Sequence, residues 1–354
     1  MDISLSRVYC VIVRYLIKAM GVTSMKRVVI DPIVFMACFS RAAMTMAVLV
    51  ASAMLLAPTQ PARAAEDLPD GLGIDAVAGA CDRTTAAAAQ ACAKGAVADY
   101  DVAQGACANF NDAGARDRCL RQAATDFRDA TDLCGEQRQA RAGVCRALGQ
   151  APYDPTIRPA EFTTNITNPY FPLRPGRTFV YRAPHSVVTV RVTNQTIKIQ
   201  GVTCRVVRDT NLVDGKVAED TFDYYAQDRQ GNVWYFGEST AEFEHGIPVS
   251  VEGSFKAGID NAKAGIIMLA NPRPGTTYRQ EFSLTVAEDL ARVEALGVRV
   301  KVPYGSFDNA LRTFEFTPLE PDAKERKFYV PGVGQVLTID LETGEREELV
   351  RVSG

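Results

Sequence analysis

The sequence predicts an α+β protein in which a disulfide-stapled antiparallel helical hairpin is followed by an antiparallel β half-barrel or sandwich. Three observations predict this fold: six cysteines in mirror-image register, a proline-rich stretch, and a long region in which apolar and polar residues alternate. We expect the hairpin over residues 79–148, a proline-rich linker over 149–175 and the β-rich domain over 176–354. These boundaries follow the changes in composition along the chain.

Two stretches without proline predict the helices of the hairpin. Residues 82–108 are rich in alanine, and residues 112–148 are rich in Ala, Arg, Gln and Glu, all of which favour helix. Asp112 is a suitable N-cap for the second helix, and Gly114 eases the reversal of the chain. The two helices should therefore run antiparallel from a turn near residue 113.

Six cysteines lie at matched distances on either side of this turn: Cys81, Cys92, Cys107, Cys119, Cys134 and Cys145. Neighbours 11 residues apart lie on one helix face but about 16 Å from each other. A disulfide requires Cα atoms within about 7 Å, so the bridges must cross between the helices. Six cysteines allow fifteen pairings. We expect the nested one, with the bridges Cys81–Cys145, Cys92–Cys134 and Cys107–Cys119.

Alternation with a period of two predicts the β-rich domain. Val188, Val190 and Val192 alternate with polar residues, and residues 298–302 repeat the pattern. The Asp214-Gly215 pair is a hairpin-turn signal between two such runs. We expect roughly eight to ten strands, and we interpret the ambiguous stretch 287–296 as strand.

The first 64 residues have the pattern of a secretory signal peptide, with Met25 as an alternative start. An apolar run over residues 42–57 follows basic residues and ends before an A-x-A cleavage signal at residues 62–64. This run is shorter than the roughly 20 residues that span a bilayer, so we expect no transmembrane segment in the mature chain. We expect cleavage near Ala64, a short linker over 65–78, and a periplasmic or extracellular protein.

The mature chain of 290 residues is acidic. It keeps 32 of the 39 Lys and Arg residues and 40 of the 42 Asp and Glu residues, which gives a net charge of −8. Nucleic acids and anionic membrane surfaces favour clustered basic charge. The composition therefore excludes nucleic acid as an expected partner.

No motif for a nucleophile elbow, a zinc protease, a Walker loop or a dinucleotide fold occurs in the sequence. Both histidines, His185 and His245, adjoin loop residues and share no ligand spacing, so we expect no metal site and no cofactor. The acidic residues near position 240 leave two alternatives open. Calcium could bind there through oxygen ligands, or Glu238 and Glu242 could act as paired carboxylates in a hydrolase.

The aromatic residues of the same region offer a ligand-binding wall. Trp234 and Phe236 share one face of a predicted strand because side chains alternate between faces. We expect them, together with Tyr225, to contact an apolar ligand. Cys204 is the odd cysteine of the mature chain, and its place in a strand favours a buried, inert thiol.

Four motifs of the β-rich region carry a resemblance: residues 166–173 (ITNPYFPL), 201–204 (GVTC), 232–238 (NVWYFGE) and 329–334 (YVPGVG). Over about 200 residues the chain resembles a family of secreted bacterial proteins of unassigned function. The last motif and the turn at 302–307 are also similar to half-barrel periplasmic proteins of the lipoprotein-carrier type. The resemblance implies a fold and a compartment, and it supplies no catalytic residue.

These observations together predict a secreted, non-catalytic binding protein. Its partner would be an apolar or amphipathic small molecule held by the sheet, or a protein of the cell envelope held by the hairpin. The alternative is a secreted hydrolase that uses Glu238 and Glu242. A cavity lined by apolar side chains would favour the first function, whereas two buried carboxylates facing a cleft would favour the second.

Overall fold

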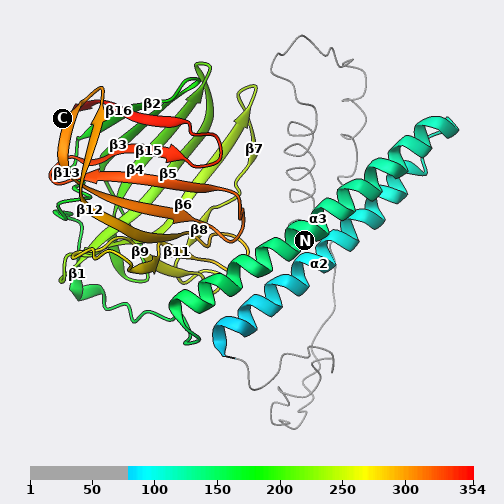
Figure 1. The fold of residues 1–354 in the computed structure, drawn as a ribbon, viewed down its shortest axis with the longest axis horizontal. Coiled ribbons are helices and arrows are strands. Elements are labelled where there is room, and N and C mark those ends of the chain that lie inside the picture. The colour runs from blue at the N-terminus through cyan, green and yellow to red at the C-terminus, as the bar shows by residue number, and fades with distance from the viewer. Residues whose placement is uncertain (1–78) are drawn as a thin grey trace, which may run out of the picture. The chain divides into compact units, whose positions relative to one another are not determined.

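The computed structural model describes residues 79–354, which form a two-helix hairpin and a curled β-sheet (Figure 1). The predicted signal peptide and the linker over 65–78 lie outside the described residues. Within residues 79–354, no helix combines the length and the apolar composition needed to cross a lipid bilayer.

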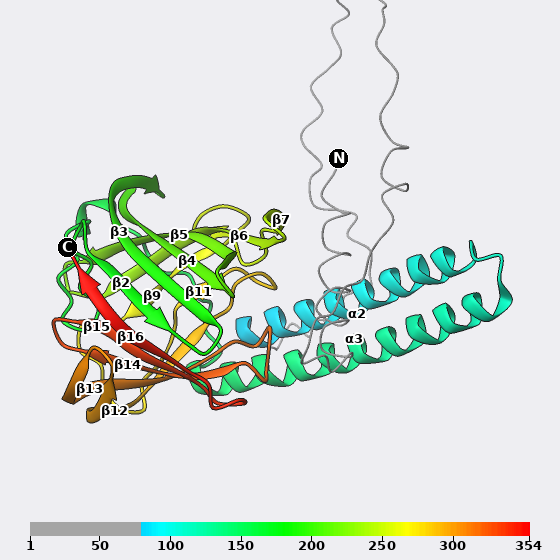
Figure 2. The same cartoon turned by 90° about the horizontal axis from the view of Figure 1, so that it is seen from above.

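The hairpin consists of α2 (Ala80–Cys107) and α3 (Ala113–Leu148), which lie side by side in both views (Figures 1 and 2). Asp112 is the N-cap of α3, and its carboxylate accepts a hydrogen bond of 2.6 Å from the backbone N–H of Ala115. Such a cap contributes about 1 kcal/mol to the helix. The predicted helices and the predicted turn are therefore both present.

Three disulfides cross between the helices at Cα separations of 5.6 to 5.7 Å: Cys81–Cys145, Cys92–Cys134 and Cys107–Cys119. Between them, small side chains such as those of Ala88, Ala96 and Ala123 fill the interface. Most other hairpin residues are exposed or half-buried, so the helices share a thin core. Covalent cross-links compensate for a core of this size.

The β-rich domain is a single antiparallel sheet and not a sandwich. Its sixteen strands are β1 (Phe162–Thr163), β2 (Thr178–Arg182), β3 (Ser186–Ile199), β4 (Val202–Val213), β5 (Lys216–Asp228), β6 (Val233–Glu244), β7 (Ile247–Ser250), β8 (Phe255–Lys256), β9 (Lys263–Met268), β10 (Thr277–Arg279), β11 (Glu281–Phe282), β12 (Leu290–Val302), β13 (Gly305–Phe316), β14 (Lys324–Val330), β15 (Gly334–Asp340) and β16 (Arg346–Ser353). Strands of only two residues show no alternation, which explains why the sequence predicts fewer strands.

The strand order is β10-β12-β13-β14-β15-β16-β2-β3-β4-β5-β6-β9-β11, so neighbours in sequence are mostly neighbours in the sheet. The sheet curls into a nearly closed barrel (Figures 1 and 2). β10 and β11 bring its two ends together beside β9. A Cβ on Gly265 of β9 would lie 2.3 Å from the backbone carbonyl of Gln280, so this close approach requires glycine.

Residues 166–173, the first motif of the family resemblance, plug one end of the barrel. Ile166 is fully buried and bridges to Leu173. The buried Asn168 side chain donates hydrogen bonds to the backbone carbonyls of Gly231 (2.9 Å) and Leu269 (3.1 Å). The plug is therefore tied to the turns at that end of the barrel.

The rest of the proline-rich stretch lies against the outer face of the sheet. Ile157 and Phe162 pack on a second apolar cluster that includes Val202, Cys204 and Phe236. The predicted linker thus contributes to the packing of the β-rich domain, through this contact and through the plug.

A buried ion pair joins the hairpin to the barrel. Arg141 of α3 and Glu288, just before β12, are 4% and 2% exposed. The guanidinium contacts the carboxylate through two nitrogens, at 2.7 Å and 3.0 Å. Glu288 also accepts a hydrogen bond from the backbone N–H of Thr285. Because both groups are buried, the charged form of each is stabilised by the opposite charge of the other.

We predict that residues 150–354 fold without the hairpin. Removing the helices uncovers Glu288 to water, so its charge is then solvated and the barrel keeps its own core. A fragment of residues 150–354 should give a β-type circular dichroism spectrum and a cooperative thermal transition. The absence of a cooperative transition would mean that the hairpin is part of the folding unit.

Candidate functional site: a cavity inside the barrel

The barrel holds a cavity of about 630 Å³. Phe171, Pro172 and Leu173 of the plug line its floor. Its other end is lined by Ser186 and Thr343, beside the β2–β3 and β15–β16 turns, and Thr343 is exposed. The cavity is therefore closed by the plug at one end and reaches solvent at the other.

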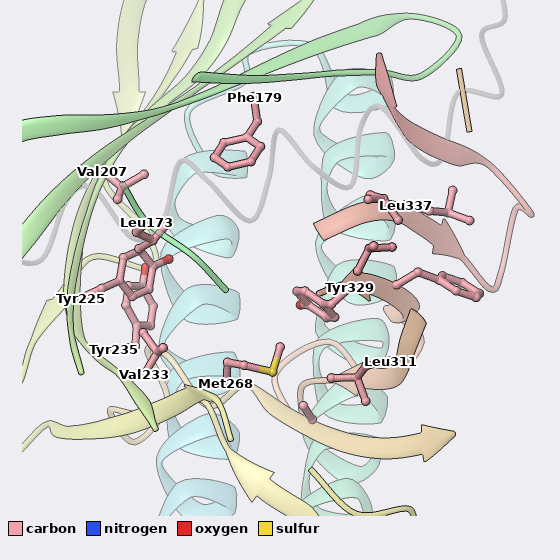
Figure 3. Close-up of a cluster of buried hydrophobic side chains, with 14 of the residues drawn as sticks. Leu173, Phe179, Val207, Tyr225, Val233, Tyr235, Met268, Leu311, Tyr329 and Leu337 are labelled. Atoms are coloured by element: carbon pink, nitrogen blue, oxygen red, sulfur yellow. The ribbon is translucent and has the colours of Figure 1, made fainter. Parts of the chain in front are cut away.

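One part of the cavity wall is apolar. It is formed by side chains of β2, β3 and β4, namely Phe179, Val188, Val190 and Val207. In Figure 3, Val207 and Tyr225 lie on one side of the barrel interior, and Tyr329 and Leu337 lie on the other. These residues belong to the main core cluster of the domain, so the wall is a continuation of the core.

The rest of the wall is acidic. Among the described residues, the cavity is lined by one lysine, by no arginine or histidine, and by eight carboxylate side chains: Asp209, Glu219, Asp223, Glu315, Glu325, Asp340, Glu345 and Glu347. The sequence analysis predicts an apolar lining, and the structure has this acidic part of the wall in addition to the apolar part. A wall of this composition attracts positive charge and repels anions.

Two of these carboxylates neutralise the lysine. The ammonium of Lys327 on β14 lies 3.0 Å from the Glu315 carboxylate and 3.2 Å from that of Glu325. Glu315 also accepts hydrogen bonds from Thr313 (2.8 Å) and Tyr329 (2.9 Å). Burial alone would raise the pKa of Glu315, but Lys327 and these hydrogen bonds hold it below its ordinary value. Glu315 is therefore ionised and paired.

The carboxylate of Asp209 on β4 differs from that of Glu315 in its contacts. Asp209 lines the cavity, and within residues 79–354 no side chain or backbone N–H donates a hydrogen bond to its carboxylate. Burial, and then the nearby carboxylates of Asp223, Glu347 and Glu219, raise the pKa of Asp209 well above its ordinary value. Asp209 is half-buried, and a carboxylate with these like-charged neighbours becomes protonated or takes a cationic partner.

Asp223 and Glu238 share the hydroxyl of Tyr235. The Tyr235 oxygen lies 2.6 Å from the Asp223 carboxylate and 2.8 Å from that of Glu238. A phenol has one proton, so the second contact requires a proton on a carboxyl group. Burial raises the pKa of Asp223 to about 7, and burial together with Asp223 raises that of Glu238 to about 8. The pair therefore holds this proton at neutral pH.

A β-bulge explains which side chains of β6 face the interior. Val233 and Tyr235 belong to the interior cluster, whereas Phe236 belongs to the outer one. Gly237, at φ 140°, then shifts the alternation opposite β5, so that Glu238 returns to the interior side and contacts Tyr235. A Cβ at Gly237 would lie 2.2 Å from the carbonyl oxygen of Phe255.

Of the predicted ligand-binding residues, Tyr225 lines the cavity. Trp234 and Phe236 lie on the other face of β6, in the outer cluster beneath Phe162. The Trp234 indole N–H donates to Asp228, 2.8 Å away. These two residues therefore stabilise the outer packing and are separated from the cavity by the sheet.

The two carboxylates that the sequence analysis predicts as a pair are those of Glu238 and Glu242. Glu238 and Glu242 are four residues apart on β6, and the ladder places Glu242 opposite Glu219 and Glu238 opposite Asp223. The carboxylate that shares a hydrogen-bond partner with Glu238 is that of Asp223. Glu238 itself is not among the residues that line the cavity, whereas Asp209, Asp223 and Lys327, which the sequence analysis does not name, are.

The described residues also bear on metal binding and on the free thiol. Within the described part of the chain, no group of three or more His, Cys, Asp or Glu side chains is arranged to hold a metal ion. The free thiol of Cys204 is fully buried in the outer cluster, and burial raises its pKa to about 12. Such a thiol is not a nucleophile at physiological pH.

Comparison with known proteins adds one structural similarity. No family model matches the chain, and no curated protein matches it. A solved structure described as a "putative lipoprotein" from Parabacteroides distasonis is similar over 52% of this chain and 98% of its own length. The sequence identity is 11% and the TM-score is 0.27, which is too low to support an inference about function.

Proposed function

We propose that the protein is a non-catalytic binding protein that takes a small amphipathic molecule into its barrel. The observation that carries this proposal is the cavity of about 630 Å³ with a closed floor, an open end and two chemically distinct walls. Ligand pockets in proteins span about 300 to 1,000 Å³. The volume therefore suits a small molecule.

The two walls would contact different parts of the ligand. Apolar contacts along Val188, Val190 and Val207 contribute about 25 cal/mol for each Å² of ligand surface removed from water. The carboxylates on the other wall add directional hydrogen bonds and fix the orientation of the ligand. An amphipathic ligand satisfies both walls, whereas a purely apolar one leaves the acidic wall without partners.

The hydrolase alternative would use Glu238 with Asp223. A glycosidase holds its two carboxyl groups on either side of the scissile bond, so the space between them must admit the substrate. Here the hydroxyl of Tyr235 occupies that space, and Tyr235 is 6% exposed. This arrangement favours a structural role for the pair and supports binding over hydrolysis.

Filling the cavity should abolish binding. Val190→Phe projects a larger ring from β3 into the apolar part of the cavity. Calorimetric titration would use three probes with the same dodecyl tail: dodecyltrimethylammonium, dodecyl maltoside and dodecanoate, each below its micelle concentration. We expect the wild-type protein to bind at least one of them, and Val190→Phe to weaken that binding at least tenfold, which corresponds to roughly 1.4 kcal/mol.

The matched control is Thr189→Phe, which adds a ring at the neighbouring position on the opposite face of β3. It should bind as the wild type does. Equal affinity in Val190→Phe and the wild type, or no binding of any probe, would contradict the proposal. Turnover of a glycoside that Glu238→Gln abolishes would establish the hydrolase instead.

A further inference from the structure

We propose that the ligand of this cavity is an organic cation with an apolar tail, whose positive group lies among the carboxylates of β4 and β5. This inference rests on the proposed binding function and assigns the chemical class of the ligand. It follows from the charges of the wall, from the contacts of Asp209, and from the aromatic side chains beside them.

The balance of charge favours a cation. Eight carboxylates and one lysine line the cavity, and Lys327 is already paired with Glu315 and Glu325. No positive side chain remains among the described lining residues for the acids of β4 and β5. An anionic ligand would therefore meet uncompensated repulsion, whereas a cation would supply the missing charge.

Asp209 is the centre of the proposed site. Its carboxylate faces the cavity and receives no hydrogen bond from the residues described. Asp223 and Glu219 on β5 and Glu347 on β16 act on it with like charge, and Lys327 on β14 is the cation that acts on it. A half-buried carboxylate among like charges is stabilised in its ionised form by a positively charged partner.

Aromatic rings lie beside these carboxylates. Tyr225 follows Asp223 by two residues on β5 and lines the cavity, stacked on Tyr235 with ring centroids 4.9 Å apart. Phe171 meets the Tyr225 ring edge-on at 5.4 Å. Alkylated ammonium groups bind favourably over such rings. The apolar wall of β3 then continues from this region and would accept the tail.

The protonation of the site couples binding to pH. Burial raises the pKa of Asp223 to about 7 and that of Asp209 above its ordinary value. An ammonium group favours the ionised carboxylates, so its binding releases protons. A permanently charged ligand should therefore bind more tightly as pH rises from 6 to 8, while a neutral ligand should not respond.

The test compares dodecyltrimethylammonium with dodecyl maltoside, which share a tail and differ in charge. We expect the wild-type protein to prefer the cation at pH 8, and the preference to shrink severalfold at pH 6. Asp209→Asn should weaken binding of the cation by roughly tenfold or more and change binding of the maltoside less than twofold. Asp308→Asn, on an exposed part of β13, removes an equal charge elsewhere and should change neither.

Glu219→Gln provides a second variant at the open end of the cavity, where this residue is exposed, and it should weaken cation binding in the same direction. Equal affinity for both probes, with Val190→Phe abolishing both, would leave the binding function standing and overturn the assignment of a cation. Tighter binding of dodecanoate than of dodecyltrimethylammonium would overturn it as well.

Discussion

Replacing Arg141 with methionine is expected to destabilise the full-length protein by about 3 to 5 kcal/mol. The substitution removes the guanidinium that contacts the Glu288 carboxylate, 2% exposed, between the hairpin and the barrel, and leaves only the more distant charge of Arg279 near it. The remaining hydrogen bond from Thr285 does not compensate for a buried charge. Chemical denaturation followed by circular dichroism would give the difference in the free energy of unfolding.

Two further variants identify the cause of this loss. Arg138→Met removes an exposed arginine from the same helix and should change the stability by less than about 0.5 kcal/mol. Adding Glu288→Gln to Arg141→Met removes the buried charge that has lost its contacting partner and should restore most of the stability. If Arg141→Met were as stable as the wild type, the ion pair would not couple the hairpin to the barrel.

The second large effect is a loss of stability as pH rises. The pKa of Asp223 is raised from 3.8 to about 7, that of Glu238 from 4.5 to about 8, and that of Asp289 from 3.8 to about 6. A carboxyl group with a raised pKa binds more protons in the folded than in the unfolded state between its two pKa values. The stability is therefore highest at low pH within this window and falls until the pH passes the folded values.

A tenfold difference in proton affinity between the folded and unfolded states corresponds to about 1.4 kcal/mol, and these carboxyl groups interact. We therefore expect the free energy of unfolding to fall by roughly 3 to 5 kcal/mol between pH 5 and pH 8.5. The variant with Asp223→Asn and Glu238→Gln keeps hydrogen-bonding groups at Tyr235 and removes two titrations. It should lose well under half as much stability over the same range, because the two groups with the largest shifts no longer titrate. A wild-type stability that stays constant or rises from pH 5 to pH 8.5 would contradict the protonation of this cluster.

The helical hairpin could be predicted from the sequence because its determinants are local. The cysteines lie at matched distances in sequence on either side of the turn beside Asp112. Because a helix has a fixed rise per residue, each cysteine of one helix then lies level with one cysteine of the other, which gives the nested pairing. The structure contains these three bridges, and the Asp112 cap as well. Alternation likewise predicted the long strands, such as β3 and β12.

The cavity could not be predicted in the same way, because it depends on which faces of distant strands meet. Asp209 and Asp223 come to line one cavity only once β4 and β5 pair and the sheet closes. Strict alternation also places Glu238 with Trp234 and Phe236, whereas the bulge at Gly237 moves Glu238 to the interior. The glycine in the middle of an aromatic strand was the available signal of that bulge.

A crystal structure of the wild-type protein grown with dodecyltrimethylammonium at pH 8 tests the central claim most directly. We expect one ligand inside the barrel, with its tail along Val190 and Val207 and its ammonium group among Asp209, Asp223 and Tyr225. A ligand bound only on the outer face near Trp234, or a cavity that contains none under conditions where binding is saturated in solution, would contradict the proposed site.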